Sequence, residues 1–172
     1  MRQTLKPIFL SLCLILFAFT GIKAQAGMEL NPNAEQDIEF VVEFIQAAIA
    51  ADEEKIRGAC HDEAMGYGPT VKDSADLSTF IKVRQQAVKN LPGGEFKSGP
   101  AMSVIVAEGG MAGTWVFNWG VVETPMKDGD PAEMMVHVVT RLIEGKVERW
   151  FAYFDNAYMM ERLGYKFTPP GE

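Results

Sequence analysis

The sequence has 172 residues, 48% of them hydrophobic and 23% charged, with a net charge of −7 at neutral pH. This length and composition predict one globular domain, large enough to bury a core. The excess of acidic residues argues against a nucleic-acid partner, because phosphate binding requires clustered Lys and Arg, and no basic amphipathic segment predicts binding to a membrane surface.

Residues 1–26 are typical of a cleaved signal peptide. A basic start precedes the apolar residues 8–19, which are too few for a comfortable membrane span, and 24–26 read Ala-Gln-Ala. An uncleaved N-terminal anchor is the alternative. We therefore expect a secreted or periplasmic protein with one domain over 27–172. Cleavage removes three basic residues and leaves 13 bases against 23 acids, a net charge of −10.

The next part of the chain predicts helices. Apolar residues recur at helical spacing from Ile38 to Ile49, and Asp52 precedes a second, short helix with acidic residues in its first turn. The expected elements are helices over about 34–50 and 52–60, a strand within 63–70, and a helix from Ser74 or Asp76 to the LPGG at 91–94.

The second half predicts an antiparallel meander. Long strands alternate with turn-rich segments, and Gly145 marks a tight hairpin. Because helices come first and the meander follows, the fold class is α+β. The expected strands span 95–107, 112–124, 133–144 and 146–155, followed by a short helix over 156–163.

Cysteine and histidine are too scarce for a metal site. Cys60 is the only cysteine after the signal peptide, so it is either buried or paired with another chain. His61 follows directly, but neighbouring side chains point apart and do not form a catalytic dyad. With two histidines and no ligand spacing, we expect no metal and no cofactor.

The C-terminal segment GKVERWFAYFDNAYMMERLG (145–164) resembles the nuclear transport factor 2-like superfamily, and within it the SnoaL-like group. The similarity covers nearly all of 33–165. It implies a cone, in which a curved sheet wraps a cavity that helices close, and a homodimer formed through the open sheet face. Members include isomerases, cyclases, hydrolases and binding domains, so the fold does not give the function. The residues that carry the resemblance are Gly145, Lys146, Val147, Trp150, Tyr153, Phe154, Asp155, Leu163 and Gly164.

The strand over 112–124 carries a row of aromatic residues. Trp115, Phe117, Trp119 and Glu123 alternate, so they share one side of the strand. Such a row is typical of a ligand-cavity wall, and equally of core packing or a dimer face.

Glu123 is a candidate general base, since a carboxylate in an apolar cavity can act near neutral pH; a solvated strand end is the alternative. In the epoxide-hydrolase branch of the family an arginine stands two residues before the carboxylate. Val121 stands there in this sequence.

Three further residues are candidates for proton transfer. Tyr153 and Asp155 share one side of the last strand, and in catalytic relatives the matching aspartate is the acid/base group. The alternative for Asp155 is an N-cap of the last helix. His137 titrates near neutrality and lies either on the convex surface or, with a bulge, in the pocket. Tyr67, in the first strand region, is a candidate pocket residue.

Two functions follow from these patterns. The first is a domain that binds a small apolar molecule or mediates assembly, with Tyr67, the aromatic row over 115–119 and Glu123 as binding residues. The second is a SnoaL-like isomerase, cyclase or hydrolase with Asp155 as acid/base, assisted by Tyr153 and His137. The complete acid–base set of the enzymes is not visible, which favours the first.

Overall fold

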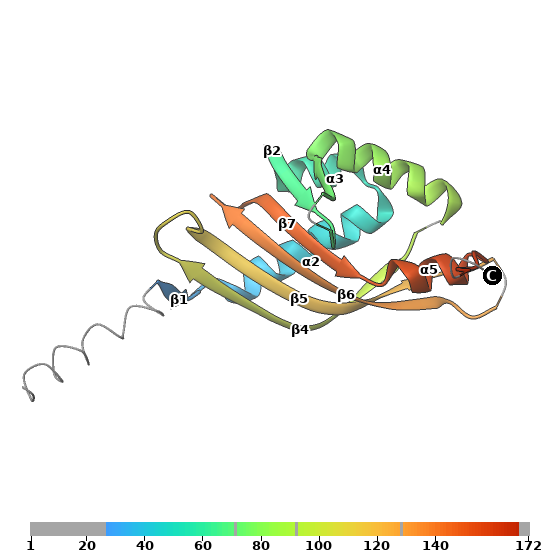
Figure 1. The fold of residues 1–172 in the computed structure, drawn as a ribbon. Coiled ribbons are helices and arrows are strands. Elements are labelled where there is room, and N and C mark those ends of the chain that lie inside the picture. Colours follow the sequence, from blue (N-terminus) through green and yellow to red (C-terminus); the bar gives the residue numbers. More distant parts are fainter. Residues whose placement is uncertain (1–26, 71, 92, 128, 169–172) are drawn as a thin grey trace, which may run out of the picture.

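A computed structural model of the chain describes residues 27–70, 72–91, 93–127 and 129–168 (Figure 1). The expected signal peptide, 1–26, lies outside the described residues. In the described part, no helix is long and apolar enough to cross a membrane.

The described chain forms four helices and one seven-stranded sheet in the order β1-β4-β5-β6-β7-β2-β3. The α+β class is therefore confirmed. The strands are antiparallel except for β2 and β7, which pair in parallel. The helices are α2 (Ala34–Ala50), α3 (Glu53–Ala59), α4 (Leu77–Asn90) and α5 (Asn156–Arg162). The strands are β1 (Met28–Leu30), β2 (Cys60–Tyr67), β3 (Ser74–Asp76), β4 (Glu95–Val106), β5 (Gly113–Thr124), β6 (Ala132–Ile143) and β7 (Lys146–Phe154).

Two short edge strands were not predicted. β1 pairs with the end of β4. β3 occupies Ser74–Asp76, where the sequence predicted the start of a helix; these residues pair with Met65–Tyr67 of β2. Asp76 then caps α4 by accepting a hydrogen bond from the Thr79 amide at 2.7 Å. One residue thus ends a strand and begins a helix, so of the two predicted helix starts Asp76 is the observed one and Ser74 lies in β3.

The sheet is strongly curved, and α2, α3 and α4 lie on its concave side (Figure 1). Register shifts mark three irregularities: one in β4 between Ser98 and Ala101, one opposite Arg141 and Leu142 of β6, and one in β2 between Cys60 and Met65. Bulges of this kind bend a strand and increase its twist. The curvature separates a covered concave face from an open convex face.

Trp150 of β7 lies at the centre of the core. Its ring packs edge-on against Phe44 of α2 and Phe80 of α4, with centroid distances of 5.4 and 4.7 Å. Beneath it lies Gly66 of β2, where a Cβ atom would fall only 2.3 Å from Trp150 Cζ2. Gly66 therefore lets the indole lie against the backbone of the neighbouring strand.

We expect Gly66→Ala to lower the free energy of unfolding by about 1–3 kcal/mol, because overpacking displaces the Trp150 ring or the backbone. Gly58→Ala is the matched control, since Gly58 lies in α3 and a Cβ atom added there would meet no atom within 4 Å. There alanine should stabilise the helix by about 0.5–1 kcal/mol. Urea denaturation measures both. Equal stability of the two variants would contradict the close approach of Gly66 and Trp150.

Candidate ligand-binding cavity

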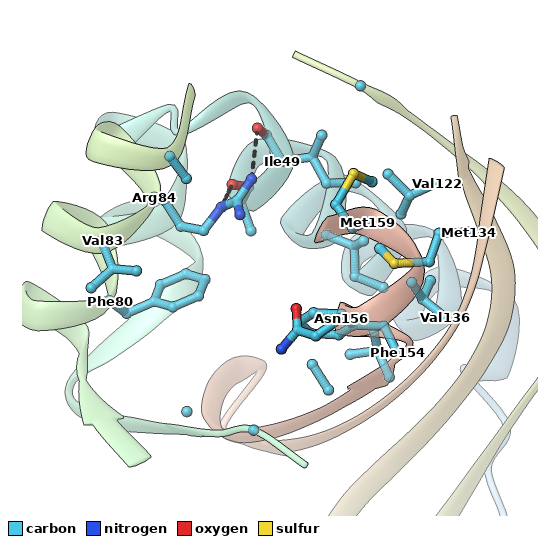
Figure 2. Close-up of a pocket in the computed structure, with 18 of the residues that line it drawn as sticks. Ile49, Phe80, Val83, Arg84, Val122, Met134, Val136, Phe154, Asn156 and Met159 are labelled. Atoms are coloured by element: carbon cyan, nitrogen blue, oxygen red, sulfur yellow. Dashed lines mark hydrogen bonds between the residues drawn. The ribbon is translucent and has the colours of Figure 1, made fainter. Parts of the chain in front are cut away.

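A cavity of about 540 Å³ lies between the helices and the concave face of the sheet. Side chains from α2 and α4 form one side, and β5, β6, β7 and α5 form the other (Figure 2). Its volume falls within the range of about 300–1,000 Å³ that is typical of small-molecule sites. The walls are mainly apolar, and include Ile49, Phe80, Val122, Met134, Val136 and Trp150.

The last helix, α5, closes one side of the cavity. Met159, Met160 and Leu163 line the cavity, although none of the residues of α5 is buried. Together with Met134 of β6, the two methionines give this wall unbranched side chains that adapt to different ligand shapes. The cavity therefore has a rigid wall at Trp150 and an adaptable wall at α5.

Arg84 of α4 is the cationic side chain in this lining. Its Nε donates to the Ala48 carbonyl at 2.8 Å, and a terminal nitrogen donates to the Ile49 carbonyl at 3.2 Å. Both carbonyls belong to the last turn of α2, where helix carbonyls are only partly satisfied by the backbone; the Ala48 carbonyl also accepts from the Ala51 amide at 3.3 Å. Burial lowers the pKa of the Arg84 guanidinium, which nevertheless stays charged.

Other polar groups also reach the cavity. Asp73, Thr124 and Asn156 contribute to its lining. The amide of Asn156 points toward the open space, as does the ring of Phe80 from the opposite side (Figure 2). These few polar groups in an apolar wall can orient a bound molecule.

Of the residues that the sequence proposed for ligand binding, Tyr67 contributes to this lining. Its ring, however, stacks on Phe151 at 4.9 Å, and Phe151 stacks in turn on Trp115. The ring therefore lies on the opposite face of the sheet from Trp150 and the cavity. The Arg149 guanidinium lies 5.9 Å from the Tyr67 ring centroid. Tyr67 stands at the end of β2, beside the strand that carries Trp150.

Trp115, Phe117, Trp119 and Glu123 lie on the other side of β5, away from the cavity. The alternate residues of β5 face the helices, and Val122 and Thr124 among them line the cavity. The aromatic row therefore belongs to the convex face.

Local contacts hold both ends of this row. At one end, Trp115 Nε1 donates to the Met111 carbonyl at 2.8 Å, and the Arg141 guanidinium covers the ring. At the other end, Glu123 forms an ion pair with Lys97 of β4.

His137 and Tyr153 come together on this convex face. His137 pairs in register with Trp119 on one side and Tyr153 on the other. The three rings stack, with centroid distances of 4.4 Å for Trp119–His137 and 6.1 Å for His137–Tyr153. His137 Nδ1 also lies 3.1 Å from the Asn118 carbonyl. Neither His137 nor Tyr153 is among the residues that line the cavity.

Asp155 caps the last helix, which was the alternative to the acid/base role predicted for it from the sequence. Its Oδ1 accepts a hydrogen bond from the Tyr158 amide at 3.0 Å and so caps α5. The side chain is exposed and is not among the residues that line the cavity. The structure therefore does not bring the three residues proposed for proton transfer into one enclosed site.

Sequence reasoning missed Arg84, although a signal was present. Phe80, Arg84, Ala87 and Leu91 all line the cavity and recur at a spacing of three or four along one side of α4. An arginine within an apolar stripe of a helix indicates a cation that faces a pocket or a partner.

Cys60 is buried, which was one of the two predictions made for it from the sequence. Burial raises the pKa of its thiol to about 12, with Lys146 opposing the shift. The thiol therefore stays protonated and packs as a small apolar group. His61 beside it contacts the Ile143 carbonyl through Nε2 at 2.9 Å. No group of three potential metal ligands occurs within the described ranges.

Comparison with known proteins identifies the fold through solved structures, although no family model and no curated protein matches the sequence. A SnoaL-like protein from Shewanella denitrificans aligns with a TM-score of 0.58 and 10% identity, over 79% of this chain and 100% of its own. The chain has the nuclear transport factor 2-like fold. The cone-shaped α+β architecture predicted from the sequence is thereby confirmed.

Two further solved structures share this fold. An LEH-like epoxide hydrolase of M. tuberculosis aligns with a TM-score of 0.55 and 18% identity, over 77% of this chain and 92% of its own. An NTF2-like protein of unknown function from Cytophaga hutchinsonii aligns with a TM-score of 0.50 and 12% identity. The alignment covers 77% of this chain and 96% of that protein. At these identities the nuclear transport factor 2-like fold is shared, and the function must come from this chain's own residues.

We expect Asp155→Ala to accelerate hydrogen exchange at the Tyr158 amide, because a side-chain cap contributes about 0.5–2 kcal/mol. Asp155→Asn should keep the exchange slow, since asparagine caps about as well as aspartate. Exchange measured by NMR distinguishes the two. Equal acceleration in both variants would contradict the capping role.

Proposed function

We propose that the protein is an exported domain that binds a small apolar molecule in the cavity between its helices and sheet. The observation that carries this proposal is a cavity of about 540 Å³ whose walls are mainly apolar. Burial of apolar ligand surface there would contribute about 25 cal/mol per Å². Export is inferred from the sequence of residues 1–26.

Binding fits the lining better than catalysis does. The titratable residues in the described lining are Tyr67, Asp73 and Arg84, and the Tyr67 ring stacks on Phe151 on the convex side of the sheet. Asp73 is exposed, and Arg84 does not exchange protons at neutral pH. A general acid or base needs a titratable group within hydrogen-bond reach of the substrate, and Asp155 is held at the cap of α5.

The test uses N-phenyl-1-naphthylamine, a neutral dye that fluoresces in apolar surroundings. We expect the wild-type protein to bind it, and Ala87→Phe to weaken binding by about tenfold or more, because the new ring fills part of the cavity. Ala107→Phe is the matched control, since Ala107 is exposed and outside the lining. Equal binding by both variants, or no binding by the wild type, would contradict the proposal.

We further propose that the convex face mediates a homodimer. Met102, Trp119, Met135 and Tyr153 are all exposed there. Lys97 and Glu123 lie on the same face, so it carries charges of both signs beside the apolar strip. A surface of this kind suits an isologous contact, in which one patch packs against its own copy.

Met135→Glu should convert a dimer into a monomer, because it places a charge within this strip, where Met135 is 77% exposed. Met111→Glu is the matched control, since Met111 is also an exposed methionine, at 53%, but lies in the loop before β5. Sedimentation velocity reports the mass of each variant. A wild-type monomer, or an unchanged Met135→Glu dimer, would contradict the assembly proposal.

A further inference from the structure

Arg84 differs from the surface cations of this chain in how it is held. Its guanidinium is anchored to α2 through the Ala48 and Ile49 carbonyls, while the residue also lines the apolar cavity (Figure 2). α2 has no basic residue in its own last turn, so Arg84 supplies the positive charge that complements the end of this helix. One edge of the guanidinium is thereby fixed in place.

The rest of the guanidinium has no acidic partner in the described part of the chain. None of the ion pairs formed there includes Arg84, and burial is the only influence on its pKa, with no nearby carboxylate raising it. An arginine has five N–H donors, and its hydrogen bonds to other described residues go to the two carbonyls of α2. Donor groups therefore remain for a ligand.

An unpaired cation in an apolar wall favours a particular kind of ligand. Partly buried charge is stabilised when an opposite charge meets it with good hydrogen-bond geometry. The planar guanidinium matches a carboxylate, which can accept two parallel N–H bonds. An entirely apolar ligand would instead remove water from the guanidinium without replacing those hydrogen bonds.

We propose that the cavity binds an apolar carboxylic acid, with its carboxylate on the guanidinium of Arg84 and its hydrocarbon part along the sheet and α5. This inference rests on the proposed binding function and specifies the ligand class. Asn156, whose amide points into the same space (Figure 2), offers a further hydrogen bond to a polar atom of the ligand. The adaptable wall formed by Met134, Met159 and Met160 then contacts the hydrocarbon part.

The experiment compares two probes with the same ten-carbon chain, decanoate and 1-decanol, by displacement of N-phenyl-1-naphthylamine at neutral pH. The wild-type protein should bind decanoate about 10–100-fold more tightly, as expected for hydrogen bonds to a charged group. The chain is acidic overall, with a net charge of −7. Nonspecific surface attraction would therefore oppose this preference rather than create it.

Three variants assign the preference to Arg84. Arg84→Met should abolish the preference for decanoate and leave decanol binding within about threefold, whereas Arg84→Lys should retain part of it. Lys82→Met is the matched control, because Lys82 is exposed on the same helix and outside the lining. It should leave the preference unchanged. A thermal unfolding scan of each variant checks that the fold persists without the contact to α2.

The outcomes separate this inference from the proposed function. Equal binding of decanoate and decanol to the wild-type protein would overturn the carboxylate inference and leave the apolar cavity in place. A preference that survives in Arg84→Met would overturn the role of Arg84. If the protein binds the dye but neither probe displaces it, the carboxylate inference fails, and the proposal that the cavity binds apolar molecules is kept. If the dye itself does not bind, both fail.

Discussion

The packing of Trp150 over Gly66 is the contact on which the rest of the structure depends. The indole lies against the backbone of β2 and meets Phe44 of α2 and Phe80 of α4 edge-on. One side chain thus sets the distance of two helices from the sheet. Since Trp150, Phe44 and Phe80 also line the cavity, the contact that builds the core also builds the binding site.

Away from Trp150, smaller side chains and α5 complete the enclosure. Ala48 and Ala87 on the helices and Ala152 on the sheet leave space that larger residues would fill. Arg84 joins α4 to the end of α2 across this space. The guanidinium is thus both a structural tie between two helices and a charged group at the cavity, and its second role depends on the first.

The C-terminal segment around Trp150 carried the resemblance from which the cone-shaped fold was predicted. The meander and helices were predicted close to their observed bounds. The site was less predictable. Alternation in β5 shows that Trp115 and Trp119 lie on the same side of the strand, but it does not show which side of the sheet the helices cover. β3 was missed because three residues carry no periodic signal. Arg84 lies in a stripe of helical spacing, but that spacing does not show that the carbonyls of α2 hold its guanidinium.

The central claim is that the ligand enters the cavity rather than covering the exposed convex face, and methionine methyl NMR tests it most directly. Met134, Met159 and Met160 line the cavity, whereas Met102 and Met135 are exposed and lie in register with Phe117 and Val121 on the convex side. Titration with 1-decanol should shift the methyl signals of the first three and leave the other two in place. Shifts confined to Met102 and Met135 would contradict the claim.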